Sequence, residues 1–369
     1  MDTKNVLMAV VLSTLVLVFW ATFFEPPPIE KQNIENQITK TQDPSSPSIE
    51  KVKVPKKITR SEAIAKVNRI KIENGNIKGS LSLQGAIIDD IVFKNYKESL
   101  ESDNKVIFLN PKSSKKGYYI ETGWASNSNK KLKLPLDNTI WKVKGNKVLS
   151  PNKPVVLEWD NNEGLIFTKK IELDDKFLFS ITQGIKNTSN ESYEFFPYAQ
   201  ITRNYKPDVI PIYILHEGFI GMFDDELKEI DYKDIEDEKF TTNSAKGWLG
   251  ITDKYWITAI VPENGKKFKS EFLTSDEKYK ANFIIKEPTT LKSNASITNE
   301  IKAFVAAKEV AVIDSYAENL GIEKFDLSID WGWFYFITKP LFFVIEYFFK
   351  LTGNFGVAII ILTALVRLA

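Results

Sequence analysis

The sequence contains no cysteine and a single histidine, His216. Without thiols the chain has no disulfide, no thiolate nucleophile, no zinc–thiolate site and no cysteine to carry a lipid anchor. One imidazole also excludes every metal site that needs a pair of histidines. There is no glycine-rich loop for a phosphate, and the acidic residues between 224 and 238 lack calcium-loop spacing. We therefore expect no cofactor, no metal site and no catalytic residue, and the protein is predicted not to be an enzyme.

An excess of either charge is also missing. Lys and Arg together number 49 and Asp and Glu 48, so the formal net charge is +1. This balance provides no general attraction to nucleic acid, and we expect no nucleic-acid partner. Strands and helices do not alternate along the sequence, which argues against a nucleotide-binding parallel sheet.

A large apolar block occupies the C-terminal end of the sequence. Its first part, 331–352, carries only three charged side chains, spaced by seven and four residues. This spacing places them on one face of a helix, with aromatic residues filling the rest. The pattern predicts an amphipathic helix lying flat at the membrane–water boundary, or alternatively a buried aromatic helix of a soluble protein. The expected interfacial anchors are Trp331, Trp333, Lys339, Glu346 and Lys350.

A break follows at Gly353 and Gly356, where the chain can change direction. The apolar run after it is shorter than the roughly 20 residues that a bilayer crossing needs. We expect 355–369 to be the start of a second transmembrane helix, left incomplete in this sequence. Arg367 stands within this run and is expected to point into a watered cavity or toward a carboxylate. The alternative is that it snorkels to the far interface.

The N-terminal end carries another apolar run, 6–24, without a charge and about as long as a bilayer crossing requires. It lacks a clear cleavage site, so we expect an uncleaved signal anchor with residues 1–5 in the cytoplasm; a cleaved signal peptide is the alternative. Residues 25–60 are rich in proline and polar residues and are predicted to form a flexible linker. Its basic end either is solvated or touches lipid headgroups or a partner.

Between these ends the sequence reads as many short strands separated by turns. Asn74-Gly75 is a strong hairpin signal, and further turn signals occur at 160–164, 187–191 and 263–265. Many strands at this spacing predict a β-sandwich, which we assign to a single all-β domain over 61–321. One helix is expected near the end of this domain, over 308–320, with Gly321 as its stop signal.

The only local acid–base candidates are His216 and its neighbour Glu217. A histidine next to a carboxylate could perform acid–base chemistry, but a histidine that is hydrogen-bonded within a loop is the favoured interpretation. Two other classes of function therefore stay open. One is a membrane-anchored carbohydrate-binding module, and the other is a scaffold that docks a translocon.

Four stretches carry a resemblance to a known family: 215–221, 247–256, 330–341 and 353–367. With these motifs the sequence resembles the YidC/Oxa family of membrane protein insertases, in particular its bacterial YidC type. The resemblance implies that 61–321 is a periplasmic β-supersandwich and that all of 25–330 is periplasmic. It also implies an α-helical bundle of five core helices around a hydrophilic groove, in which Arg367 matches a groove arginine. The remaining core helices are absent from this sequence.

The function implied by the resemblance is insertion, folding and assembly of membrane proteins in the bacterial inner membrane, alone or with the Sec translocon. The implied partners are nascent membrane proteins, the Sec translocon and the phospholipid bilayer. The implied mechanism is physical. A watered groove shortens the distance over which a polar tail is dehydrated, and a positive side chain there attracts acidic residues of the passing segment.

Overall fold

The structure is a computed structural model that describes residues 58–127, 132–207, 215–276, 278–332 and 334–368. The chain divides into two compact units, Met1–Val54 and Pro55–Ala369, and only the second contains described residues. The expected N-terminus (1–5) and signal anchor (6–24), most of the expected linker, Trp333 and Ala369 therefore lie outside the described residues.

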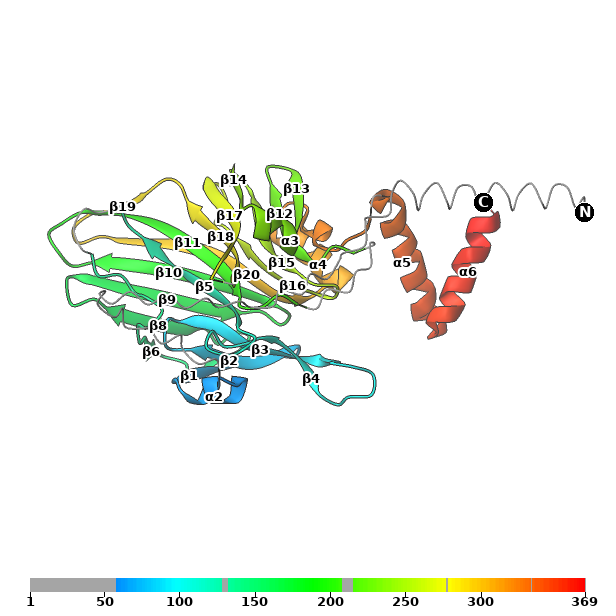
Figure 1. Ribbon diagram of the computed structural model, residues 1–369, viewed down its shortest axis with the longest axis horizontal. Helices are drawn as coiled ribbons and strands as arrows, with labels where there is room; N and C mark the ends of the chain where they lie inside the picture. The colour runs from blue at the N-terminus through cyan, green and yellow to red at the C-terminus, as the bar shows by residue number, and fades with distance from the viewer. Residues whose placement is uncertain (1–57, 128–131, 208–214, 277, 333, 369) are drawn as a thin grey trace, which may run out of the picture. The chain divides into compact units, whose positions relative to one another are not determined.

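Two large β-sheets make up most of the second unit (Figure 1). The larger sheet has 11 strands, and its neighbouring strands are antiparallel except for the pair β1 and β7. Across this sheet lie β14 (Phe240–Ser244), β17 (Phe268–Ser275), β18 (Lys278–Ile285), β11 (Tyr193–Arg203), β5 (Tyr118–Ala125), β3 (Ile87–Lys97), β2 (Ile77–Ser82), β1 (Arg69–Glu73) and β7 (Val148–Leu149). Two further strands pair beside this path, β4 (Lys105–Leu109) with β3 and β19 (Thr289–Leu291) with β11.

The smaller sheet has nine strands, all antiparallel to their neighbours. Across it lie β13 (Glu226–Asp231), β12 (Gly218–Phe223), β15 (Gly247–Thr252), β16 (Trp256–Val261), β20 (Ser296–Ala307), β10 (Leu178–Asn187), β9 (Leu165–Leu173), β8 (Val155–Asp160) and β6 (Lys142–Lys144). The described part of the chain is thus mostly β-sheet with a few helices, which confirms the prediction of a large β-domain at that level.

The core lies between the two sheets. Along β9 and β18 buried residues alternate with more exposed ones, as expected for strands that cover a core with one face. Aromatic rings join the sheets across this core: Phe219 of the smaller sheet stacks on Phe272 of the larger at 5.1 Å. At another point Phe93 of the larger sheet stacks on Trp256 of the smaller at 4.9 Å. Such pairs add to the gain from burying apolar area and favour one relative placement of the sheets.

The helices are short apart from the last two. Their bounds are α2 (Arg60–Ala65), α3 (Tyr232–Asp237), α4 (Val310–Leu320), the 3-10 helix η1 (Phe325–Ser328), α5 (Tyr335–Thr352) and α6 (Phe355–Leu368). The helix expected over 308–320 is present as α4, and Gly321 ends it in the left-handed conformation with φ of 61°.

Helices α4 and η1 cover the outer face of the smaller sheet. Trp248 of β15 meets Phe325 of η1 edge-to-face at 5.2 Å. Phe304 of β20 meets Tyr316 of α4 at 4.9 Å. This second apolar contact explains why nearly every residue of β15 and β16 is buried, whereas strands with one covered face alternate.

At two of the predicted turns the chain passes from one sheet to the other. The turn predicted at 187–191 leads from β10 in the smaller sheet to β11 in the larger, and the turn at 263–265 leads from β16 to β17 in the same way. In contrast, Asn74-Gly75 closes the antiparallel pair β1 and β2, as predicted. Turn residues mark where a strand ends, but they do not show whether the next strand pairs with it or crosses the core.

The described fold begins before residue 61, the residue at which the β-domain is predicted to start. The linker was expected to reach residue 60, but the fold already includes Ile58, which bridges to Ser114. Thr59 caps α2 and forms a reciprocal capping box with Glu62, and Arg60 forms an ion pair with the buried Asp90. The capping-box pattern Thr-x-x-Glu is a helix-start signal in the sequence that the compositional reading of this segment overlooked.

A buried cation holds the two sheets together near one edge of the core. Arg203, at the end of β11, is 4% exposed and bonds to Asp253 of the smaller sheet's β15–β16 connection at 2.7 Å. It also donates to Tyr232 at 3.1 Å and to Tyr205 at 3.0 Å, and its guanidinium lies 4.8 Å from the centre of the Tyr118 ring. Removing the cation would leave the partly buried Asp253 carboxylate without its partner.

We expect Arg203→Met to lower the free energy of unfolding by about 3–5 kcal/mol, because it breaks an ion pair whose cation is buried and leaves the partly buried Asp253 without its partner. Denaturant unfolding of the full chain, followed by tryptophan fluorescence, measures this change. Lys302→Met is the matched control, since Lys302 pairs with Glu300 at the surface, and its effect should stay below about 1 kcal/mol. Equal effects of the two substitutions would contradict the assigned role of Arg203.

Candidate functional site

Lys339 connects the expected interfacial segment to the β-domain through two ion pairs. Lys339, in the second turn of α5, contacts Asp314 of α4 at 2.9 Å and Asp326 of η1 at 2.8 Å. Burial works against its charged form, but the hydrogen bonds to these carboxylates raise the pKa of Lys339 above its ordinary value. The ammonium that was expected as a membrane anchor therefore bonds within the protein and stays charged at physiological pH.

Trp331 belongs to the same joint. Its indole N–H donates to the backbone oxygen of Asp326 at 3.2 Å, and its ring meets Phe342 of α5 edge-to-face at 5.6 Å. The Lys339 ammonium lies 5.8 Å from the centre of that ring, within the range of a cation–π contact. Trp331 thus packs between the β-domain and α5. Trp333, the other expected tryptophan anchor, lies outside the described residues.

The rest of α5 exposes its aromatic side chains. None of its residues is buried, and Tyr347 is 64% exposed. Glu346 and Lys350 form the expected pair one helical turn apart, with 2.8 Å between the charged atoms. An apolar surface of this size is unusual in water and marks a face that another apolar phase or partner covers.

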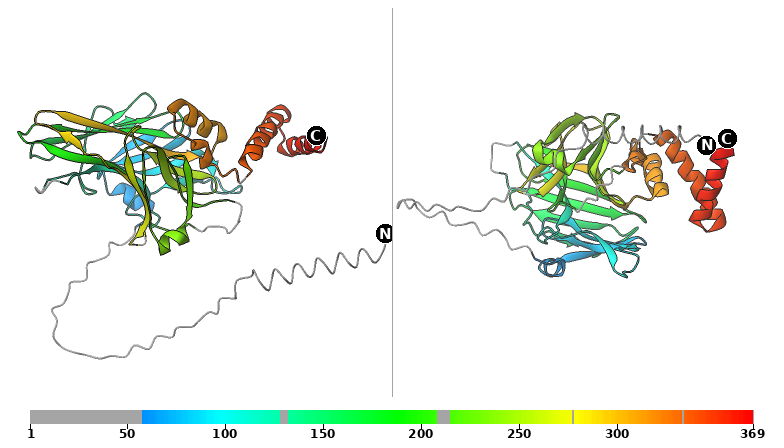
Figure 2. Two further views of the ribbon diagram at one scale, coloured as in Figure 1. Left: turned by 90° about the horizontal axis from the view of Figure 1, so that it is seen from above. Right: turned by 45° about the vertical axis from the view of Figure 1, so that its right-hand side comes forward.

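The two C-terminal helices meet at a sharp turn (Figure 2). Gly353 adopts a left-handed φ of 67° and donates its N–H to the oxygen of Phe349 at 2.8 Å, which ends α5. The side-chain oxygen of Asn354 accepts from the N–H of Val357 at 3.2 Å and caps the start of α6. The glycine break recognised in the sequence is therefore a tight turn between two helices.

Arg367 lies in the last turn of α6 and is exposed. Within the described ranges its guanidinium has no ion pair or hydrogen bond to a side chain. The neighbouring residues Val366 and Leu368 are apolar and exposed as well. Among the helices that the structure describes, none combines the length and hydropathy needed to cross a bilayer.

The acid–base candidates are both occupied by local contacts. The His216 ring bonds through Nε2 to the backbone oxygen of Phe219 at 2.9 Å and through Nδ1 to Asp231 at 3.3 Å. Glu217 accepts from the backbone N–H of Lys254 at 2.8 Å. The favoured interpretation of His216, a histidine hydrogen-bonded within its loop, is confirmed. In the described residues no group of three or more His, Asp or Glu side chains is placed to hold a metal.

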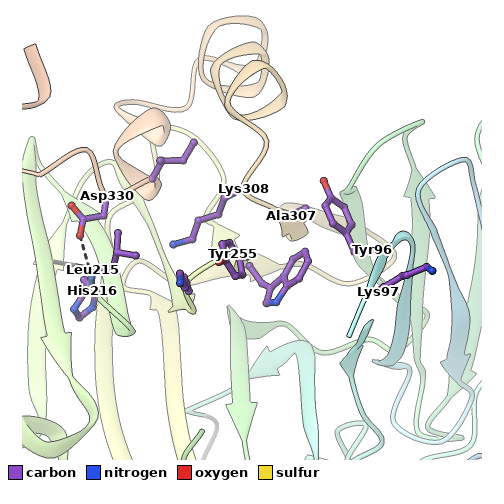
Figure 3. A pocket seen from close by; sticks show the side chains of 11 residues that line it. Tyr96, Lys97, Leu215, His216, Tyr255, Ala307, Lys308 and Asp330 are labelled. Carbon is purple, nitrogen blue, oxygen red and sulfur yellow. Dashed lines mark hydrogen bonds between the residues drawn. The ribbon is translucent and has the colours of Figure 1, made fainter. Parts of the chain in front are cut away.

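A pocket of about 420 Å³ lies beside His216 (Figure 3). Its lining comes from the end of β3, the β15–β16 connection, the residues after β20 and the segment that precedes α5. Lining residues include Tyr96, Leu215, Tyr255, Trp256, Lys308 and Asp330. Asp330 connects this pocket to the joint, because it also accepts from the backbone N–H of Gly332 at 2.8 Å.

Residues 69–344 match the family model described as the YidC periplasmic domain. The chain belongs to the YidC family. The matched region runs from β1 into the middle of α5. The contacts of Lys339 with Asp314 and Asp326 therefore lie within the region that defines this YidC domain.

Two relatives show how far the similarity extends. A protein named membrane protein insertase YidC from Pelagibacter ubique is 47% identical, and the alignment covers 100% of this chain and 66% of that protein. Another of the same name from Bradyrhizobium diazoefficiens is 36% identical, with 100% of this chain and 65% of that protein covered. The chain thus spans slightly less than two thirds of the length of these YidC proteins.

Among solved structures, the fold is similar to a galactose mutarotase related enzyme from Lactobacillus acidophilus, with a TM-score of 0.42 and 12% identity. The superposition covers 65% of this chain and 98% of that enzyme.

Sequence reasoning missed the partners that define the joint and the pocket. Asp314 and Asp326 are separated from Lys339 by 25 and 13 residues, and no sequence period connects them. Lys308 was placed at the start of a helix, whereas it precedes α4 and lines the pocket. One signal was available for Asp314: the apolar residues of the helix predicted over 308–320 lie on one face, so Asp314 is left free to contact another segment.

We expect Lys339→Met to loosen the joint, since both carboxylates lose their shared cation. A partly exposed network of this kind is worth on the order of 1 kcal/mol, so alternative placements of α5 should gain about fivefold in population. Because the sequence has no cysteine, spin labels at Ser315→Cys and Tyr347→Cys report the distance between α4 and α5 without background. The full chain in lipid nanodiscs should give a broader distance distribution with Lys339→Met.

Lys350→Met is the control for this measurement, because its partner Glu346 is on the same helix. It removes a cation from α5 but no contact with the β-domain. A distribution that broadens equally in both variants, or in neither, would show that Lys339 does not position α5.

Proposed function

We propose that the chain belongs to a membrane protein insertase and chaperone that inserts, folds and assembles integral membrane proteins in the bacterial inner membrane. The observation that carries this function is the match over the whole chain to proteins named membrane protein insertase. That match includes α5 and α6, the two helices whose apolar surfaces the β-domain leaves exposed.

The arrangement we propose places 1–5 in the cytoplasm and 6–24 across the membrane as an uncleaved anchor. The residues from 25 to 330 are periplasmic, with the two-sheet domain as a β-supersandwich. Helix α5 lies flat on the membrane surface, supported by its exposed aromatic residues and its Glu346–Lys350 pair. After the turn at Gly353, α6 enters the bilayer as the first part of a helical bundle.

The depth of α5 can be measured with single spin labels in the full chain in bilayers. A label at Tyr347→Cys should sit at headgroup depth, because an in-plane amphipathic helix buries its apolar face only about 5–10 Å. Relative accessibility to oxygen and to a water-soluble nickel complex gives this depth. A label on α6 at Ile360→Cys is the matched comparison and should lie deeper. Equal depths near the bilayer centre would show that α5 crosses the membrane.

Arg367 is the residue to which we assign substrate contact. It lies 13 residues into α6, counted from Phe355, so at 1.5 Å per residue it reaches about 18 Å along the helix. The hydrocarbon core is about 30 Å thick, which places Arg367 near its middle. A cation there costs roughly 2.5–3.5 kcal/mol against lipid, so the side chain faces a watered groove. Its positive charge attracts acidic residues of an inserting segment, and no covalent step or nucleotide is required.

The proposed partners are nascent membrane proteins, the phospholipid bilayer and the Sec translocon. Clients are expected to meet Arg367 through acidic residues in their translocated tails. The carbohydrate-binding alternative would need a free acid–base pair, whereas His216 and Glu217 both bond within their own neighbourhood. We therefore assign the protein no catalytic activity.

In the complete protein, Arg367→Ala should slow insertion of substrates with acidic translocated tails by roughly tenfold, because electrostatic attraction of this kind raises association by about 10-fold or more. Arg367→Lys should largely preserve the rate, since the positive charge remains. Reconstituted proteoliposomes and a protease-protection assay of tail translocation measure both.

Substrates with neutral tails are the first control for this experiment, and Lys350→Ala, which removes a cation outside the expected groove, is the second. Neither should change insertion by more than a small factor. Insertion of acidic tails at the unmodified rate in Arg367→Ala would remove this residue from the mechanism.

A further inference from the structure

The pocket beside His216 contains a lysine without a partner. Lys308 follows β20 directly, and its backbone N–H donates to the oxygen of Tyr255 at 2.9 Å, which holds it in place. Its side chain extends toward Leu215 and Tyr255 (Figure 3). In the part of the chain that the structure describes, the ammonium makes no hydrogen bond and no ion pair. An ammonium in a pocket without a counter-ion is a candidate binding group.

The carboxylates around Lys308 act on it from a distance: Asp253, Asp330, Glu217 and Glu229. The first of them bonds to Arg203 at 2.7 Å. Glu217 accepts from the backbone N–H of Lys254 at 2.8 Å. Both carboxylates are therefore directed at other donors, and neither neutralises Lys308 by contact.

The other two carboxylates, Asp330 and Glu229, also make no direct contact with the Lys308 ammonium in the described part of the chain. Asp330 accepts from the backbone N–H groups of His216 at 3.1 Å and Gly332 at 2.8 Å. Burial raises the pKa of Glu229, which weakens its charged form. Burial in turn lowers the pKa of Lys308 to about 8, in spite of the surrounding negative charge. The ammonium has thus lost water and gained no direct partner.

Three aromatic side chains form part of the pocket wall. Tyr255 is 58% exposed at its mouth, with the Lys254 ammonium 5.0 Å from its ring centre. The indole of Trp256 is fixed from behind by stacking on Phe93 at 4.9 Å. Tyr96 bonds through its hydroxyl to Glu309 at 2.7 Å, so it presents a ring and no free polar group. Rings held in this way provide an apolar surface of fixed shape.

Lys308 lies unpaired beside the rings of Tyr255 and Trp256. This arrangement favours a ligand that has both a negative group and an apolar chain. We propose that this pocket binds a small anionic amphiphile, whose carboxylate or phosphate group pairs with Lys308 while its apolar chain lies against Tyr255, Trp256 and Ile329. Lys254 at the mouth adds a second positive charge. This binding site is independent of the insertase function proposed above, so either can fail without the other.

An ion pair with Lys308 makes the affinity for the anion depend on pH. The anion pairs with the ammonium form only, and the lysine of the free pocket loses its proton near pH 8. Binding raises the pKa of Lys308, so affinity is full below about pH 8 and falls as the pH rises further. A carboxylate ligand is used for the pH series, because it titrates well below this window.

The test uses the full chain in phosphatidylcholine nanodiscs and six-carbon ligands that dissolve as monomers. Dissociation constants for hexanoate, hexyl phosphate and 1-hexanol are measured by saturation-transfer difference NMR, with empty nanodiscs as the blank. We expect both anions to bind at least about tenfold more tightly than the alcohol, the size of one charge-assisted hydrogen bond. Acetate and inorganic phosphate, which lack the chain, should bind about tenfold more weakly than their hexyl counterparts.

Substitutions separate the two parts of the site. Lys308→Met should reduce hexanoate binding to the level of hexanol, and Tyr255→Ala should weaken hexanoate and hexanol alike. Tyr255 is largely exposed, so its removal leaves the core intact. Lys302→Met, on the same chain segment but paired with Glu300 at the surface, is the matched control and should leave all constants unchanged.

Three outcomes would overturn the assignment. Hexanol binding as tightly as hexanoate would exclude a role for the cation. Acetate binding as tightly as hexanoate would exclude the apolar wall. Hexanoate affinity that is unaffected by Lys308→Met, or that does not fall above about pH 8, would place the anion elsewhere.

Discussion

The contact between the inner faces of the two sheets is the constraint on which the rest of the structure depends. Sheets of 11 and nine strands expose too much apolar surface to be stable unless each covers the other. Stacked rings such as Phe219 on Phe272 fix how they face, and the Arg203–Asp253 bond closes one edge. Helices α4 and η1 then cover the outside of the smaller sheet, which creates the surface that receives Lys339.

Much of this fold follows from local patterns, and the rest does not. Alternation in strands such as β9 and β18, the Asn74-Gly75 hairpin and the stop at Gly321 are all visible in the sequence, because they depend on neighbours within a few residues. Which strands pair is decided by contacts over a hundred residues, as between β10 and β20. The crossings after β10 and β16 therefore could not be distinguished from hairpins.

The same limit applies to the candidate sites. Composition alone predicts that α5 and α6 lie next to lipid, and it singles out Arg367 as a charged residue on an apolar helix. The spacing of Lys339, Glu346 and Lys350 places all three on one face of the helix. Their contacts nevertheless differ. Lys339 bonds back to Asp314 and Asp326, whereas the other two charges pair with each other. Sequence spacing defines a helix face and leaves open what that face touches.

Asp330 lies where the β-domain is connected to the two C-terminal helices. It lines the pocket that contains Lys308, and it accepts hydrogen bonds from His216 on one side and Gly332 on the other. Five residues later α5 begins. A change of charge in the pocket therefore acts on a carboxylate that shapes the backbone leading to α5. Because such contacts strengthen as water is excluded, the hydrogen bonds of Asp330 help to fix the backbone between the pocket and the helix that Lys339 contacts.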